Sequence, residues 1–106
     1  VESFALRFDR PVAWGDFSTA LDMLQTTAGD RLLRVKGIVN VAGEAAPRVI
    51  QCVHHERYPD AALPAWPDAD RSTRLVFIVR GLPRSLLEHA FASFCGLRET
   101  GTSGAV

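Results

Sequence analysis

The stretch of sequence from residue 73 to residue 83 reads TRLVFIVRGLP. Its middle part, Leu75 to Val79, is an unbroken run of apolar residues, which is typical of a central β-strand. Gly81 ends this run, and Pro83 suits the first turn of a helix. The stretch therefore predicts a central strand that leads through a tight turn into a helix, and the rest of the fold can be built around this unit.

The helix predicted after Pro83 has one apolar face. The apolar residues recur at helical spacing up to Cys95, and they are Leu86, Leu87, Ala90, Phe91 and Phe94. Residues 98–106 are small and polar, so we expect them to form a flexible tail. The predicted domain therefore covers residues 1–97.

Before the central strand, the chain predicts a strand, a helix and two further strands. Apolar residues alternate over residues 3–9, and a helical pattern follows from Phe17, capped by Asp16 or Ser18 and closed by Gly29. Residues 32–41 and 48–55 then predict two strands joined by a hairpin turn. Gly37, inside the first of these, suggests a bulge or a close backbone contact.

The predicted order of elements is β-α-β-β-β-α, which favours an α+β fold. Each helix has a single apolar stripe, and an antiparallel sheet can leave one face in water. We therefore expect a two-layer sandwich, in which a four-stranded, mainly antiparallel sheet carries both helices on one face.

Composition narrows the class of function. The 106 residues suit one domain, and twelve basic residues balance twelve acidic ones. With no net positive charge, no apolar run of roughly 20 residues and no signal peptide, we expect a cytoplasmic domain without a nucleic-acid or membrane partner. The chain has no G-x-x-x-x-G-K-[ST] motif and no converging nucleophile and base, so we expect neither a nucleotide site nor catalysis in this chain alone.

One cluster of residues offers metal ligands. Cys52, His54, His55 and Glu56 are all residue types that bind zinc, and on a single strand Cys52, His54 and Glu56 would share one face. Strand spacing would hold them some 6.5–7 Å apart, which is wide for one ion. The cluster therefore predicts either a small metal-binding module or a strand edge with solvated histidines.

Two further features suggest contacts with a partner. Trp66, held between Pro64 and Pro67, is either an aromatic anchor for another domain or a lid over the domain's own core. Arg34, Lys36 and Asn40 alternate outward along one predicted strand. They form either a contact surface or an ordinary solvated face.

With the chain divided in this way, its motifs resemble those of one family. Residues 32–43 (LLRVKGIVNVAG), 49–55 (VIQCVHH), 65–68 (AWPD) and 74–82 (RLVFIVRGL) are similar, in order and spacing, to the C-terminal domain of CobW-type metallochaperone GTPases. The resemblance covers residues 3–95. Family members similar to this chain often carry a second histidine just before a proline, where this chain has Tyr58 before Pro59.

The resemblance implies a larger parent protein. It implies an N-terminal GTPase domain in the same polypeptide, with GTP, Mg²⁺ and a transition metal bound there, and a client metalloprotein that receives the metal. In that setting this chain would be an accessory domain for docking to the GTPase domain or to clients.

Overall fold

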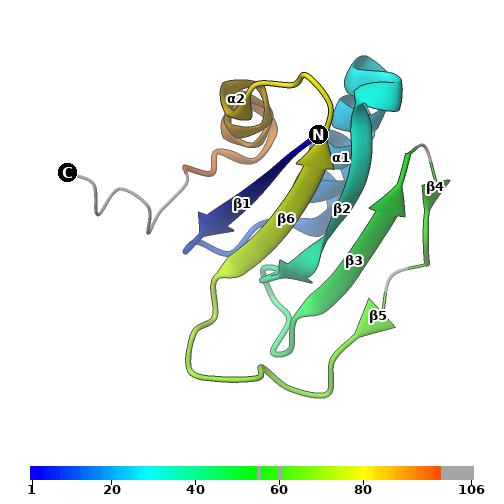
Figure 1. Cartoon of the computed structure of the whole chain (residues 1–106). Coiled ribbons are helices and arrows are strands. Elements are labelled where there is room, and N and C mark those ends of the chain that lie inside the picture. Colours follow the sequence, from blue (N-terminus) through cyan, green and yellow to red (C-terminus); the bar gives the residue numbers. More distant parts are fainter. Residues whose placement is uncertain (55, 60, 99–106) are drawn as a thin grey trace.

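An antiparallel sheet and two helices form the two layers of the protein (Figure 1). The structure is a computed structural model that describes residues 1–54, 56–59 and 61–98. Its strands are β1 (Glu2–Phe8), β2 (Leu32–Val39), β3 (Arg48–Val53), β4 (Glu56–Arg57), β5 (Ala61–Ala62) and β6 (Thr73–Val79). Its helices are α1 (Trp14–Ala28) and α2 (Arg84–Cys95), with a 3₁₀ turn, η1 (Gly29–Arg31), after α1.

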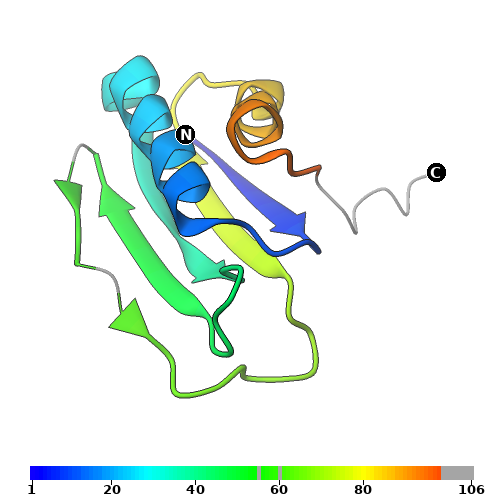
Figure 2. The same cartoon turned by 180° about the vertical axis from the view of Figure 1, so that it is seen from behind.

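Both helices cover the same face of the sheet, as the view from behind shows (Figure 2). This confirms the predicted α+β sandwich. The expected number of four strands is wrong, because the sheet has six. The two additional strands, β4 and β5, have two residues each and pair with the outer edge of β3. They satisfy backbone groups that β3 would otherwise leave unpaired, a need that strand edges commonly have.

The central position predicted for residues 73–79 is confirmed. β6 lies between β1 and β2, and the path across the sheet is β1-β6-β2-β3-β4. Its apolar run is nevertheless not buried on both faces. Leu75, Phe77 and Val79 are fully buried beneath the helices, whereas Val76 is 39% exposed on the open face. Both described helices lie on one side of the sheet, so alternate residues of β6 face away from the core.

Phe91 of α2 lies at the centre of the core. Its ring centroid is 5.3 Å from that of Phe8, 5.7 Å from that of Phe17 and 5.9 Å from that of Phe77. One side chain of α2 therefore contacts α1, β1 and β6. Phe94, which was predicted to share this apolar face, is instead 39% exposed and lies toward the groove between the helices.

Backbone contacts account for two of the predicted glycine roles. Gly29, with a φ of 56°, ends α1 as expected. A Cβ added to Gly37 would collide with the carbonyl oxygen of Arg74, so β2 and β6 approach too closely there for a side chain. The predicted cap of α1 is wrong: the helix begins at Trp14, and the N-cap residue is Ala13, which makes no side-chain cap.

Candidate functional site

The open face of the sheet, opposite the helices, carries two exposed cations on its strand β2. On β2, Arg34 lies between Val53 of β3 and Ile78 of β6. Lys36 lies two residues further along, between Gln51 and Val76. All four cross-strand neighbours are uncharged.

Between these two cations the open face is hollowed. Arg34, Lys36, Val76 and Ile78 line a hollow of about 90 Å³. We call these four residues the sheet-face patch. The structure thus places Arg34 and Lys36 at one hollow, and adds two apolar residues of the strand that the sequence predicted to be central. The period-two alternation of β6 was the signal that could have identified them.

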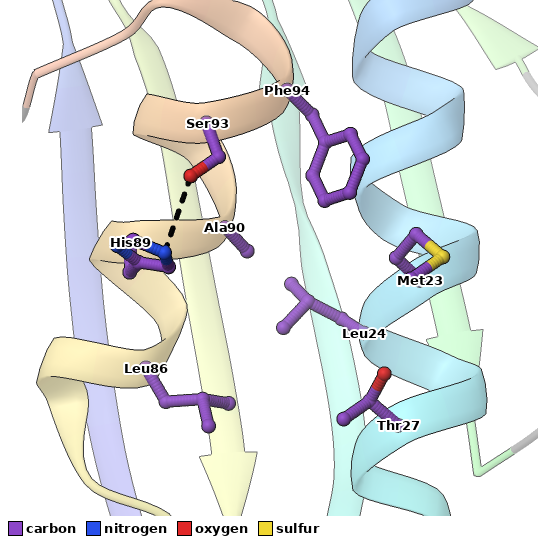
Figure 3. Close-up of a pocket in the computed structure, with 8 residues that line it drawn as sticks. All are labelled: Met23, Leu24, Thr27, Leu86, His89, Ala90, Ser93 and Phe94. Atoms are coloured by element: carbon purple, nitrogen blue, oxygen red, sulfur yellow. Dashed lines mark hydrogen bonds between the residues drawn. The ribbon is translucent and has the colours of Figure 1, made fainter.

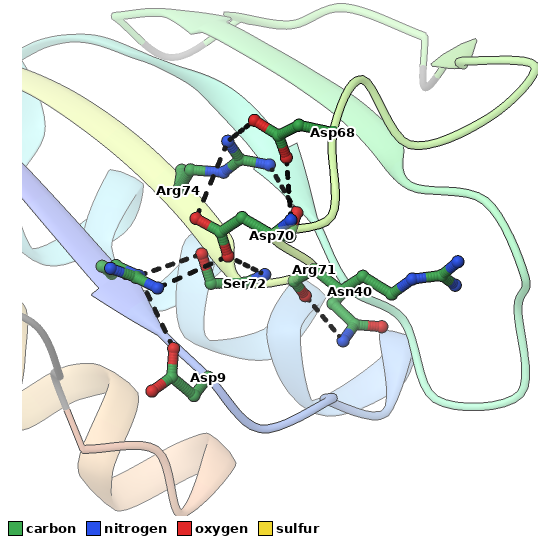
Figure 4. Close-up of polar contacts among 8 residues, drawn as sticks. Asp9, Asn40, Asp68, Asp70, Arg71, Ser72 and Arg74 are labelled. Atoms are coloured by element: carbon green, nitrogen blue, oxygen red, sulfur yellow. Dashed lines mark hydrogen bonds and ion pairs between the residues drawn. The ribbon is translucent and has the colours of Figure 1, made fainter.

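Asn40 does not belong to this patch. It follows the end of β2, where its side-chain Nδ2 donates a hydrogen bond to the carbonyl oxygen of Arg71 at 2.9 Å (Figure 4). Its backbone N–H donates to Thr73 Oγ1, also at 2.9 Å. Asn40 therefore holds the loop that precedes β6, and it does not line the hollow with Arg34 and Lys36.

That loop carries a charge network that the sequence did not reveal (Figure 4). Arg7 of β1 lies directly opposite Arg74 of β6, and like charges in that position repel each other. Asp70 lies within ion-pair distance of both, 3.4 Å from Arg7 and 3.9 Å from Arg74. Asp68 adds a second carboxylate 3.6 Å from Arg74. The loop therefore neutralises a cross-strand pair of arginines.

Asp70 is also fixed by its own loop. The backbone N–H of Ser72 donates to its carboxylate at 2.9 Å. Hydrogen bonds from the backbone and side chain of Ser72, and then the charges of Arg7 and Arg74, lower the pKa of Asp70 below its ordinary value of 3.8. The carboxylate is thus ionised at neutral pH, and its role is structural.

Trp66 lies in the loop between β5 and β6 and is half-buried. It is not among the side chains that build or pack against the hydrophobic core. Within the described residues, its indole makes no ring stacking or cation–π contact. Contact of Trp66 with a partner stays a prediction.

Trp14 is more firmly held. Its ring stacks on Phe17 with the centroids 5.6 Å apart, and the guanidinium groups of Arg48 and Arg57 lie 4.5 and 5.5 Å from its centroid. Arg57 also donates a hydrogen bond to Ser18 Oγ at 2.8 Å. Trp14 thus fastens α1 to β3 and β4 through cation–π contacts that spacing alone did not reveal.

The predicted metal-ligand cluster does not lie along one strand. β3 ends at Val53, His54 occupies a turn with a φ of 52°, and Glu56 lies on β4, opposite Val53. Cys52 is buried in the core, while His54 and Glu56 are exposed. The premise that Cys52, His54 and Glu56 share a strand face is therefore wrong.

Over the described ranges, no three His, Cys, Asp or Glu side chains are close enough to hold a metal ion. His55 lies outside the described residues. Metal binding by this segment stays a prediction, and stoichiometric zinc uptake that His54→Ala abolishes would support it.

Cys95, at the end of α2, is not an activated thiol. Its Sγ donates to the carbonyl oxygen of Asp16 at 3.4 Å. Burial, and then the negative charge of Asp16, raises the pKa of the Cys95 thiol to about 11. Because the thiolate is the reactive and metal-binding form, this side chain is poorly suited to either chemistry at neutral pH.

A second hollow lies between the two helices (Figure 3). It measures about 300 Å³, and its wall is mostly apolar, formed by Met23, Leu24, Thr27, Leu86, His89, Ala90, Ser93 and Phe94. The only hydrogen bond drawn there joins Ser93 Oγ and His89 Nε2 at 3.3 Å. Neither described helix has the length and apolar character needed to cross a membrane.

Comparison with known proteins identifies the family. Residues 1–95 match the C-terminal domain of the cobalamin synthesis protein cobW. This chain belongs to the CobW C-terminal domain family. The predicted resemblance is thereby confirmed, and the match extends over all of the helices and strands described above.

Individual CobW relatives include a zinc chaperone. The chain is 31% identical over 99 residues to the zinc chaperone YjiA of Escherichia coli (strain K12), a match that covers 93% of this chain and 30% of YjiA. The crystal structure of Zn(II)-bound YjiA GTPase from E. coli superposes with a TM-score of 0.79 at 28% identity, over 88% of this chain and 29% of that protein. A Zn(II)-bound triple mutant of the same GTPase superposes equally well. The chain thus spans less than a third of the length of these relatives.

Proposed function

We propose that this chain is the C-terminal accessory domain of a GTP-dependent metal chaperone. The proposal rests mainly on how much of each protein the sequence match covers. It covers 93% of this chain but only 30% of a zinc chaperone. In this proposal, the remaining part of the parent protein, an N-terminal GTPase domain, binds GTP, Mg²⁺ and the transition metal. A client metalloprotein receives the metal.

The role of the domain is docking. In the described residues no three potential ligands meet at one point, and Cys95 is held protonated. The surface instead offers two contact elements, the half-buried Trp66 in its proline-flanked loop and the cations Arg34 and Lys36 on the open sheet face. Such features suit binding to another folded surface better than they suit chemistry.

The proposal is tested on the complete polypeptide and on a version that ends before Val1. Binding of a fluorescent GTP analogue with Mg²⁺, and GTP hydrolysis with and without zinc, are measured for both. We expect nucleotide binding to survive removal of this domain, because the nucleotide site lies outside it, while the zinc-dependent rate of hydrolysis changes.

Two results would contradict the proposal. If the complete polypeptide binds no GTP, the parent is not a GTP-dependent chaperone. If the shortened protein keeps its circular dichroism spectrum but no longer binds the analogue, this domain supplies part of the nucleotide site and is more than an accessory module.

A further inference from the structure

We infer that the sheet-face patch (Arg34, Lys36, Val76 and Ile78) is the surface on which the GTPase domain of the same polypeptide docks, through carboxylates that flank apolar side chains. This inference rests on the proposed function and specifies its partner surface. It depends on how charge is distributed over the fold.

Several arginines have a carboxylate partner within the domain. Five of them are paired in this way, namely Arg7, Arg48, Arg57, Arg74 and Arg84. Over the described part of the chain, neither Arg34 nor Lys36 forms an ion pair or a side-chain hydrogen bond. Arg74, by contrast, occupies the same face and has two aspartates supplied to it by a loop.

The strand register explains why these two cations remain unpaired. Opposite charges on neighbouring strands stabilise a sheet, and Arg34 and Lys36 have only Val53, Gln51 and residues of β6 beside them. The positive charge at the centre of this face therefore has no carboxylate from the described part of this domain. A partner surface with acidic groups would complement it.

The apolar members of the patch point to a protein partner. Val76 is 39% exposed, although the long side chains of Arg34 and Lys36 flank it and could cover it. A free phosphate or other small anion would leave this aliphatic surface in water. A protein surface that combines carboxylates with apolar side chains would bury it.

The tether to the GTPase domain favours a partner in the same chain over a separate protein. The hollow measures about 90 Å³, and four residues form it. Interfaces between domains of one polypeptide are of moderate size and rather polar, and a tether raises the effective concentration of the partner to roughly millimolar. A modest contact is sufficient under these conditions, whereas a free client would need a larger one.

The chain offers a specific chemical probe, since Lys36 is its only lysine. Carbodiimide joins amines to carboxylates that are in direct contact. In the complete polypeptide, we expect a cross-link from Lys36 to an aspartate or glutamate of the GTPase domain, identified by mass spectrometry. The variant Lys36→Arg keeps the charge but removes the amine, so it should lose the cross-link and thereby confirm the assignment.

Charge reversal then tests the patch itself. Arg34→Glu leaves the amine of Lys36 in place and should lower the yield of the cross-link about fivefold, as expected for the loss of an exposed ion pair next to it. Arg10→Glu, an exposed charge reversal outside the patch, is the matched control and should leave the yield unchanged. Raising the salt concentration from about 50 to about 500 mM should lower the wild-type yield, because salt screens exposed pairs.

Three results would each overturn the inference. The cross-link could stay within this domain, it could be unaffected by Arg34→Glu, or it could form only when a separate client protein is added. GTP hydrolysis by the same samples shows whether the docking surface alone is wrong or the proposed function as well. If hydrolysis is present without the cross-link, the docking surface is wrong and the accessory role stands. If hydrolysis is absent, the proposed function itself fails.

Discussion

At Gly37, β2 and β6 lie too close together for a side chain to fit. A methyl group there would collide with the backbone carbonyl of Arg74, which cannot move without disturbing the pairing of β2 and β6. We expect Gly37→Ala to lower the free energy of unfolding by about 2 kcal/mol or more, as overpacking does. Urea denaturation of the chain measures this.

Gly15 provides the control for that substitution. It lies in the first turn of α1, and a Cβ added there would have nothing within 4 Å. Gly15→Ala should therefore leave stability unchanged or raise it by up to about 1 kcal/mol, because alanine favours helix. Equal effects of the two substitutions would show that the approach at Gly37 is not close.

Asp70 makes stability depend on pH at acid values. Its pKa in the folded protein is lowered below the ordinary 3.8, so the carboxylate stabilises the fold above that pH. This contribution is lost as the pH falls through the folded pKa. Asp70→Asn should therefore be less stable than the wild type at pH 7, and the difference should shrink below about pH 4.

The corresponding measurement is the free energy of unfolding of both proteins between about pH 7 and about pH 2.5, the range over which a carboxylate of this kind titrates. A difference that stays constant over that range would mean that Asp70 acts through shape alone. The charges of Arg7 and Arg74 would then be balanced by other groups.

At the scale of elements, α2 presents one face to the core and another to the groove between the helices. Phe91 and Phe94, which lie on these two faces, are only about one turn apart along the helix. Phe91 packs against rings of α1, β1 and β6, whereas Phe94 lines the groove between the helices. We expect Phe91→Ala to lower the free energy of unfolding by about 3–5 kcal/mol. Phe94→Ala should lower it by less than about 1 kcal/mol, because its side chain already contacts water.

Thermal and urea denaturation of the two alanine variants test this difference. Both substitutions remove the same atoms from the same helix, so helix propensity cancels between them. A comparable loss in Phe94→Ala would show that the groove side of α2 is part of the core.

The elements themselves were largely predictable. Both helices, β1, β2, β3 and β6 follow from local periodicity, since each buries one face against the other layer. β4 and β5 were not predictable, because two-residue strands have no period and form only to pair the edge of β3. Phe94 was predicted to share the apolar face of α2 because helical spacing places it near Phe91, but spacing does not show that its side chain lines the groove between the helices.

At the scale of the whole molecule, the two tryptophans should behave differently. Trp14 is enclosed by Phe17, Arg48 and Arg57, whereas Trp66 lies outside the core. Trp14→Ala should lower the melting temperature by more than about 8 °C, and Trp66→Ala by less than about 4 °C. In the complete polypeptide, Trp66→Ala should weaken docking without unfolding the domain.

Differential scanning calorimetry gives both melting temperatures. A large decrease for Trp66→Ala would mean that this side chain covers the core of its own domain. The docking role would then rest on Arg34 and Lys36 alone.

The sequence by itself determined the layer architecture, the central strand and the family, because these depend on short-range periodicity and on motifs in a fixed order. Only the tertiary structure decided which side chains act together. Cys52, His54 and Glu56 are close in sequence but are separated by a turn, while Arg7, Asp70 and Arg74 are brought together from β1, a loop and β6. Which charged side chains form ion pairs depends on the strand register and on the path of the loops. Both are set by packing between segments that are distant along the chain.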